Sequence, residues 1–528
     1  MEEGRLNTQA AEKAERQARV PAVHMENITK VFGRITANSG VSLDIYRGEI
    51  LALLGENGSG KTTLMNMLSG IYFPDAGEIT VNGKPVTIRS PKDAFDLHIG
   101  MIHQHFKLVN VLTAAENVIL GLNESVLVDL KKVRRAVKDI CDKYGFSIDP
   151  DKKIYDMSVS EKQTLEIIKV LYRGADILIL DEPTAVLTPQ ETKKLFSVIR
   201  NMKADGKSVV IITHKLHEVM EISDRVAVLR KGEYVGDIAT KDTDPQQLTD
   251  MMVGRAVSLN IDRPEPKNVK ECLRIEHLSV VDEDGVKKLD DVTFTANAGE
   301  ILGIAGVAGS GQKELLEVVA GLQAAQPGSL VIYTDRDGKT STLIGKTPME
   351  IKKLGVHLAF VPEDRLGMGL VGNMDISDNM LIRSYTDGGS MFVDIGKSRR
   401  MAKDIVKEFE VVTPGIDTPV RKLSGGNVQK VLVGREISGN PSLLMSAYAV
   451  RGLDINTSYM IYRLMNEQKE HGTAVIFVGE DLDVLLALCD RILVLCSGKI
   501  SGIVDGRTAT KEGVGLMMTH LGKVGDDE

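Results

Sequence analysis

The chain has 528 residues, which is more than one hydrophobic core usually supports, so we expect at least two domains. Its 65 Lys and Arg against 73 Asp and Glu give a net charge of −8, which argues against a dedicated nucleic-acid-binding protein. A composition of 43% hydrophobic and 26% charged residues is typical of soluble globular domains.

Neither a membrane span nor a secretory signal is expected. No apolar run approaches the roughly 18 residues that cross a bilayer, and residues 1–20 are mixed in charge with no apolar central stretch. No two of the cysteines form a C-x-x-C pair, which favours buried thiols in a reducing cytoplasm. They are Cys141, Cys272, Cys489 and Cys496.

Two segments of the chain repeat, and the repeats divide it into halves. Val41–Gly55 recurs as Val292–Gly306 at an offset of 251 residues, and Ser158–Gln163 matches Ser424–Gln429 at an offset of 266. Between the halves, Asn260–Asn268 contains two prolines and several charges, which suits an extended connector. The expected organisation is a polar tail over 1–21, a first domain over 22–257, a linker over 258–270, a second domain over 271–524 and a tail over 525–528.

In chain order, the first half alternates short apolar runs with longer amphipathic stretches. Buried parallel strands are predicted over Ile50–Leu54, Ile177–Leu180 and Val209–Ile212, and helices over Thr62–Ser69 and Thr188–Asp205. Strands that alternate with helices indicate an α/β core in each half. Helical insertions are expected around residues 113–170 and 376–440.

The segment Gly55–Thr62 reads G-E-N-G-S-G-K-T and satisfies the phosphate-loop pattern between a predicted strand and a predicted helix. Its glycines allow successive backbone N–H groups to face a triphosphate, and the helix N-terminus adds positive potential. Lys61 would reach the β- and γ-phosphates, and the Thr62 hydroxyl would bind Mg²⁺. The loop therefore predicts a nucleoside triphosphate and Mg²⁺ as ligands.

A second apolar run, Ile177–Leu180, is followed by two acidic residues. Asp181 would hold Mg²⁺, and Glu182 would act as the general base for water. Alone, the pair also fits a strand that meets a solvated turn, but the phosphate loop upstream favours the metal site. His214 and Gln104 also follow apolar runs and are candidates for the γ-phosphate environment, although each also fits a structural role.

These motifs, in this order and duplicated, resemble those of the ATP-binding-cassette (ABC) ATPases. The second half carries the Leu-Ser-Gly-Gly-Asn signature at Leu423–Asn427. The fused double-cassette subunits of bacterial importers for simple sugars and nucleosides are similar at Ile102–Val109, Leu112–Asn117, Val361–Arg365 and Val412–Pro419. The resemblance covers residues 22 to 524. It implies two tandem ABC-type phosphate-loop NTPase domains, each with a RecA-like α/β core, an antiparallel β subdomain and a helical subdomain.

The resemblance implies that ATP is held between the phosphate loop of one cassette and the signature of the other. The implied catalytic residues are Glu182, His214 and Gln104, and the implied Mg²⁺ ligands are Thr62, Gln104 and Asp181. Phe32 would stack on adenine, although a lone Phe also fits a core position. The full set implied to bind ATP is Gly55, Glu56, Asn57, Gly58, Ser59, Gly60, Lys61, Thr62, Thr63, Phe32, Ser424, Gly425, Gly426 and Asn427.

The other composite site lacks the corresponding residues. Its substituted positions stand where a competent cassette has the loop lysine and threonine, the metal carboxylate, the base and the γ-phosphate histidine. They are Gln312, Lys313, Ala447, Tyr448 and Glu480. The signature that faces this site, Ser158–Glu161, has lost both glycines. One competent site is therefore expected, while the charge of Lys313 leaves nucleotide binding without hydrolysis open.

The resemblance implies an ATP-hydrolysing subunit of a bacterial importer. Its partners would be two integral membrane permeases and an extracytoplasmic solute-binding protein, and it would bind no nucleic acid. Those partners would hold it at the cytoplasmic face of the cell membrane. A nucleoside is the expected solute, with a simple sugar or riboflavin as alternatives. Two other classes stay open: a soluble tandem-cassette ATPase that acts on ribosomes or DNA, and a scaffold that binds ATP without hydrolysis.

Overall fold

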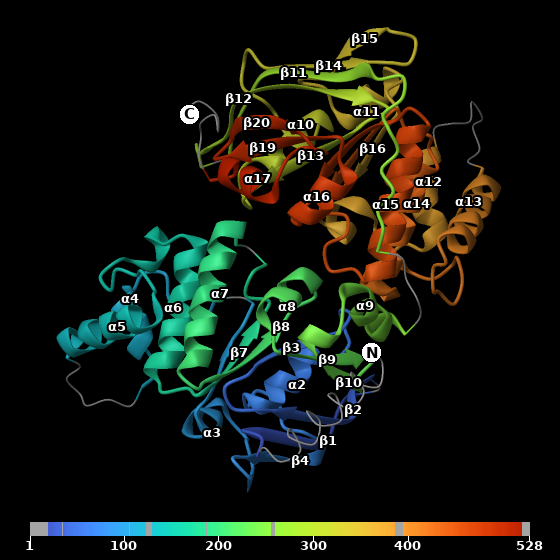
Figure 1. Cartoon of the computed structure of the whole chain (residues 1–528). Helices are drawn as coiled ribbons and strands as arrows, with labels where there is room; N and C mark the ends of the chain where they lie inside the picture. The colour runs from blue at the N-terminus through green and yellow to red at the C-terminus, as the bar shows by residue number, and fades with distance from the viewer. Residues whose placement is uncertain are drawn as a thin grey trace, which may run out of the picture. The chain divides into compact units, whose positions relative to one another are not determined.

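A computed structural model gives the structure of the chain, and the residues it describes are 20–33, 35–104, 106–122, 129–185, 187–254, 259–282, 284–385 and 394–519. The predicted tails fall almost wholly outside these residues. The chain forms two compact units, Met1–Ser258 and Leu259–Glu528, and each is described by itself. Figure 1 shows the first unit in blue to green and the second in yellow-green to red.

The elements of the first unit follow one another in the order expected for an α/β core with insertions. They are β1 (Val23–Phe32), β2 (Ile35–Ile45), β3 (Ile50–Leu54), α2 (Lys61–Leu68), β4 (Ala76–Val81), β5 (Lys84–Val86), α3 (Pro91–Asp96), β6 (Ile99–Ile102), α4 (Ala114–Ile119), α5 (Leu130–Tyr144), α6 (Val159–Tyr172), β7 (Ile177–Asp181), α7 (Pro189–Ala204), β8 (Ser208–Ile212), α8 (Leu216–Ile222), β9 (Arg225–Arg230), β10 (Glu233–Ala239) and α9 (Pro245–Val253).

The second unit repeats this order of elements. Its helices and strands are β11 (Lys270–Val281), β12 (Lys287–Ala298), β13 (Ile301–Gly306), α10 (Gln312–Val319), β14 (Leu330–Thr334), β15 (Thr340–Thr342), α11 (Pro348–Lys353), β16 (Leu358–Val361), α12 (Ile376–Ser384), α13 (Ile395–Glu408), α14 (Gly425–Ile437), β17 (Leu443–Ala447), α15 (Ile455–Glu470), β18 (Ala474–Val478), α16 (Leu482–Leu488), β19 (Arg491–Cys496), β20 (Lys499–Asp505) and α17 (Lys511–Met517).

Each unit contains a six-stranded sheet and a four-stranded sheet. In the first unit the six-stranded order is β10-β9-β3-β8-β7-β6, with every neighbouring pair parallel except β9 and β10. The second unit repeats it as β16-β17-β18-β13-β19-β20, with β19 and β20 antiparallel. The four-stranded sheets, β2-β1-β4-β5 and β12-β11-β14-β15, are antiparallel. The predicted α/β core with an antiparallel β subdomain is thus confirmed in both halves.

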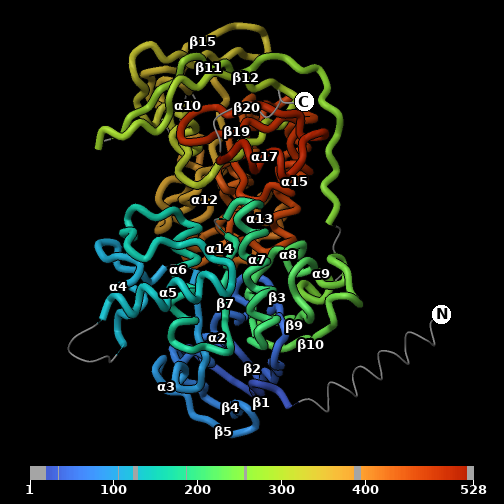
Figure 2. Tube along the Cα trace, turned by 60° about the vertical axis from the view of Figure 1, so that its left-hand side comes forward, coloured from blue at the N-terminus to red at the C-terminus, as the bar shows by residue number. Residues whose placement is uncertain are grey.

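The predicted helical insertions are also present. Helices α4, α5 and α6 form one in the first unit, and α12, α13 and α14 form one in the second. Figures 1 and 2 both show α4, α5 and α6 grouped together, apart from β1 and β4. Helices α4 and α6 start where Thr113 and Ser158 accept a hydrogen bond from the backbone three residues on, while Glu116 and Glu161 return one. Among the described residues, no helix is both long and apolar enough to span a bilayer.

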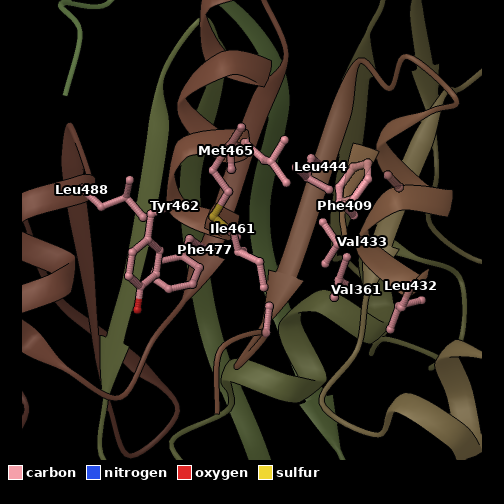
Figure 3. Close-up of a cluster of buried hydrophobic side chains, with 14 of the residues drawn as sticks. Val361, Phe409, Leu432, Val433, Leu444, Ile461, Tyr462, Met465, Phe477 and Leu488 are labelled. Atoms are coloured by element: carbon pink, nitrogen blue, oxygen red, sulfur yellow. The ribbon is translucent and has the colours of Figure 1, made fainter. Parts of the chain in front are cut away.

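The buried core of the second unit joins its helices to its central sheet. Figure 3 shows Tyr462 of α15 beside Phe477 of β18, and Leu432 of α14 beside Val361 of β16. The rings of Tyr462 and Phe477 meet edge to face with their centroids 6.2 Å apart. Strands β17 and β18 are buried along their whole length, including Ser446 of β17.

The same ion pair anchors the central strand in both units. Arg225 contacts Glu49 at 2.7 Å and donates to the backbone oxygen of Asp44 at 2.6 Å. Arg491 contacts Glu300 at 2.5 Å and donates to the backbone oxygen of its own neighbouring strand, β12, at 2.8 Å. In each unit this arginine joins the start of the central strand to the antiparallel sheet.

Candidate functional site

The phosphate loop of the first unit lies between β3 and α2, as predicted. The Lys61 side chain turns back over the loop, and its Nζ donates to the backbone oxygens of Gly55 at 2.7 Å and Glu56 at 3.0 Å. Only 6% of Lys61 is exposed. Burial lowers the pKa of Lys61, against the opposing charges of Glu182 and Asp181. These contacts place a buried cation at the start of α2.

Two glycines of the loop have backbone conformations that L side chains rarely adopt. Gly58 has φ 81° and Gly60 has φ 94°. A Cβ at Gly60 would clash with the backbone oxygen of Ala37, and the side-chain amide of Asn38 donates to the Gly60 oxygen at 3.3 Å. Strand β2 therefore packs directly against the loop at Gly60, and this close approach leaves no room for a side chain at position 60.

The predicted metal pair is brought together. The Thr62 hydroxyl donates to Asp181 Oδ2 at 3.2 Å, across two elements far apart in sequence. Asp181 ends β7, the neighbour of β8 and then β3 in the sheet, so its carboxylate reaches the start of α2. Burial raises the pKa of Asp181 to about 6, although the hydrogen bond from Thr62 opposes this rise. A buried carboxylate of this kind is stabilised when a cation binds beside it.

These two residues fit Mg²⁺. The donors are a hydroxyl and a carboxylate, which are the hard oxygen ligands that Mg²⁺ prefers. Within the residues that the structure describes, no group of three or more His, Cys, Asp or Glu could hold a metal ion. A site with so few protein ligands suits Mg²⁺, which keeps waters and takes phosphate oxygens as its other ligands.

Glu182 and His214 are in direct contact. The Nδ1 atom of His214 lies 2.8 Å from Glu182 Oε1, and the side chain of Glu182 is 18% exposed. Burial would raise the pKa of Glu182, but the hydrogen bond from His214 and the charges of His214, Lys61 and Lys215 outweigh it and lower the pKa. Glu182 is therefore ionised at neutral pH, as an acceptor of a proton from water must be.

Gln104 and Phe32 lie at the borders of this site. Gln104 is exposed and follows the carboxyl end of β6, next to β7 in the sheet, so it lies on the same sheet edge as Asp181. Phe32 ends β1 with 42% of its surface exposed, which rules out the core alternative. Its ring meets Tyr72 edge to face with centroids 5.1 Å apart.

The phosphate loop of the second unit has the same fold without the charge. Gln312 occupies the position of Lys61, is 2% exposed, and its Nε2 donates to the backbone oxygen of Val307 at 3.1 Å. Gly309 and Gly311 have φ 87° and 100°, close to those of the first loop. The side chain of Lys313 is 63% exposed and lies 3.7 Å from Glu317 on its own helix. The loop is thus kept while its buried cation is lost.

In the second unit Tyr448 stands at the position of the base, and Glu480 stands at the position of the histidine. Arg451 contacts Glu363 at 2.5 Å and Glu480 at 3.2 Å. Burial raises the pKa of Tyr448 to about 12, and Glu480 and Glu363 add to the rise, so Tyr448 stays neutral and cannot accept a proton from water. Ala447, at the position of Asp181, is buried and carries no metal ligand. Glu363 follows β16 as Gln104 follows β6.

The two signatures start their helices differently. In the second unit Ser424 and Gly425 are exposed at the start of α14, and the Asn427 side chain donates to Ser424 Oγ at 2.9 Å. In the first unit Glu161 stands at the position of Asn427, and its carboxylate accepts from the Ser158 N–H at 2.7 Å. Glu161 also pairs with Lys152 at 2.7 Å, so an ion pair occupies the start of α6, whereas the corresponding contact at α14 joins two neutral side chains.

Several residues of the site were missed by sequence reasoning. Asn38 and Tyr72 carry no local signal, because their roles come from contacts between strands and loops distant in sequence. Lys215 and Glu218 did leave a signal. Lys215 directly follows His214 and Glu218 lies four residues after it, and at the 266-residue offset they are replaced by Asp481 and Val484.

The family described as ABC transporter matches residues 38–185 and 289–446. The guanosine import ATP-binding protein NupO of Bacillus subtilis is 43% identical over 501 residues, which cover 94% of this chain and 97% of that protein. The nucleoside import ATP-binding protein NupA of Lactococcus lactis is 40% identical over 503 residues, covering 94% and 97%. The glucose import ATP-binding protein TsgD13 of Haloferax volcanii is 39% identical over 539 residues, covering 96% of each chain.

Proposed function

This chain belongs to the ABC transporter family, and from that premise we propose that it hydrolyses ATP to drive import of a nucleoside. The observation that carries the choice of solute is the identity of 43% and 40% with two proteins named for guanosine and nucleoside import, over 94% of the chain. A simple sugar is the second candidate, because a relative named for glucose import is 39% identical over 96% of the chain.

We assign hydrolysis to the first unit's site. The loop N–H groups and Lys61 would hold the phosphates, and Thr62 and Asp181 would hold Mg²⁺, which would neutralise charge on the phosphates. Glu182 takes a proton from water as the water oxygen bonds to the γ-phosphorus. The bond from phosphorus to the β-phosphate oxygen breaks, and ADP leaves with that electron pair. His214 orients the Glu182 carboxylate through their 2.8 Å contact.

We propose that the second unit contributes its signature rather than a second reaction. Ser424 and Gly425 are exposed at the start of α14, where free backbone N–H groups suit a γ-phosphate. The second unit's own loop lacks a buried cation, a metal carboxylate and a base, and Lys313 is turned toward Glu317. On this proposal the first unit's site alone hydrolyses ATP, and two membrane permeases and an extracytoplasmic solute-binding protein complete the importer at the cytoplasmic face of the membrane.

The test is transport by the full chain reconstituted with its permeases and binding protein in vesicles. Phosphate release and uptake of labelled guanosine, ribose and glucose are measured together. We expect ATP-dependent guanosine uptake that exceeds sugar uptake, and its loss in Glu182→Gln. Uptake of a sugar in preference to guanosine would identify a simple sugar as the solute. A complex that releases no phosphate would identify a binding scaffold, and co-purification with ribosomes in place of permeases would identify a different class.

A further inference from the structure

Three polar side chains form a closed group beside the Glu182–His214 contact. The hydroxyl of Thr184 donates to Glu218 Oε2 at 2.6 Å. The Nζ of Lys215 lies 3.2 Å from Glu218 Oε1 and donates to the backbone oxygen of Thr184 at 3.1 Å. Thr184 is 1% exposed and Glu218 is 4% exposed. A buried carboxylate is thus satisfied by one hydroxyl and one cation.

This group joins the two segments that carry the catalytic pair. Thr184 lies two residues after Glu182, and Lys215 directly follows His214. Glu182 has φ 46°, a left-handed conformation that is strained for a non-glycine residue. Its backbone N–H donates to the oxygen of Ile212 at 2.8 Å, and the Thr184–Lys215 bond closes the other side of the same turn.

The second unit shows that the backbone turn does not depend on these three side chains. Tyr448, at the position of Glu182, has φ 50°, and its N–H donates to the oxygen of Val478 at 3.0 Å. The same backbone turn therefore forms where the three polar residues have been replaced. The replacements at the 266-residue offset are Val450, Asp481 and Val484. The group is lost together with the base and the histidine, although the turn remains.

We propose that Thr184, Lys215 and Glu218 are positioning residues for ATP hydrolysis, which hold Glu182 and His214 in mutual contact. The inference rests on the proposed function of the first unit's site. None of the three is assigned a contact with ATP or Mg²⁺. A carboxylate that must take a proton from a water aimed at phosphorus loses efficiency with a small displacement, and a link between its segment and that of its partner prevents that displacement.

The first test is Thr184→Val in the full chain within its permease complex. We expect kcat for ATP to fall about tenfold, with KM within about twofold and the melting temperature within about 2 °C, because only alignment is lost. Thr184→Ser restores the hydroxyl and should restore kcat to within about threefold of wild type. The matched control is Thr249→Val, which removes another fully buried threonine hydroxyl, bonded to the Pro245 oxygen at 2.8 Å. It should leave kcat unchanged.

The second test removes both charges together, as Lys215→Met/Glu218→Val, so that no buried charge is left unpaired. Val484, at the position of Glu218 in the second unit, indicates that the fold accepts an apolar residue there. We expect a folded protein that binds a fluorescent ATP analogue as wild type does and shows the same loss in kcat. An unchanged kcat in both variants would overturn the inference, as would unfolding of both, which would make the group structural.

The positioning role and the site of hydrolysis are distinguished by comparing two variants. If Glu182→Gln stops turnover while Thr184→Val does not change it, the positioning role is wrong and the assignment of the site stands. If Glu182→Gln leaves turnover intact, the assignment of the site is wrong, and the positioning role falls with it.

Discussion

Asn117 in the first unit and Asn379 in the second make the same hydrogen bonds. Asn117 accepts from the N–H of Val109 at 2.8 Å and donates to its oxygen at 3.1 Å. Asn379 accepts from the N–H of Val371 at 2.8 Å and donates to its oxygen at 3.2 Å. The arginine pairs at Glu49 and Glu300 are kept in the same way.

The contacts around Glu182, in contrast, differ between the two units. The contact between Glu182 and His214 is replaced by Tyr448 and Glu480, and the latter is held by Arg451. Buried polar networks that recur in both units stabilise the shared fold, because each unit contains the same loops and strand ends. Networks found in one unit alone serve something that the other does not do. The difference between the units therefore separates residues of the fold from residues of the chemistry.

The largest expected effect comes from Glu182→Gln. Loss of the base should lower ATP turnover of the assembled complex by about 100-fold to 10,000-fold, as measured by phosphate release. ATP binding should remain, since Gln keeps the shape and a hydrogen bond to His214. Tyr448→Phe, at the same position of the second unit, is the matched control and should keep turnover within about twofold of wild type. Turnover that survives Glu182→Gln, or is lost in Tyr448→Phe, would contradict the assignment of hydrolysis to the first unit.

The next largest effect is expected on stability, from removing the arginine of the ion pair that both units share. Arg225→Met leaves Glu49, whose side chain is 13% exposed, without its partner and should lower the free energy of unfolding of the first unit by about 3 kcal/mol. Arg491→Met should cost the second unit a similar amount, because the side chain of Glu300 that it leaves without a partner is 6% exposed, against 13% for Glu49. Calorimetry of the full chain measures both. Equal melting curves for wild type and Arg225→Met would show that the shared pair is not needed for the fold.

Much of this comparison was predictable from the sequence. The strands Ile177–Leu180 and Val209–Ile212 and the helix after Thr188 were predicted almost to the residue, because short apolar runs and a Thr-x-x-Glu start are local signals. The loop from Gly55 to Thr62 was predicted for the same reason. These signals are carried by neighbouring residues and do not depend on how the chain folds back.

Other parts could not be predicted, because they depend on contacts between distant segments. The sequence showed Gln312 as a lost lysine, but not that its amide takes over a loop contact and preserves the loop. It offered Lys313 as a replacement charge, but the contact with Glu317 is fixed by helix geometry. Arg451 had no role until the sheet brought Glu363 and Glu480 to the same edge.

A smaller effect is expected from Asp181→Asn, which keeps the hydrogen bond from Thr62 but removes the charge that attracts a cation. The Mg²⁺ concentration for half-maximal turnover should rise about tenfold, because a dication is held less firmly by a neutral amide. A Mg²⁺ titration of phosphate release measures this. Asp176→Asn is the control at the other end of the same strand, where the side chain is 67% exposed and pairs with Lys207. An equal shift in both variants would remove Asp181 from the metal site.

The smallest expected effect is the most selective test of the comparison. Gln312→Lys restores the loop lysine of the second unit, and its chain can reach the Val307 oxygen that Gln312 contacts. Turnover should stay within about twofold of wild type, because Ala447 still supplies no metal ligand and Tyr448 no base. The reciprocal change, Lys61→Gln, should keep the first loop folded, as Gln312 does, yet lower turnover by about 100-fold or more. A doubling of turnover in Gln312→Lys would mean that a single charge separates the two units, and that the losses around Tyr448 and Glu480 are incidental.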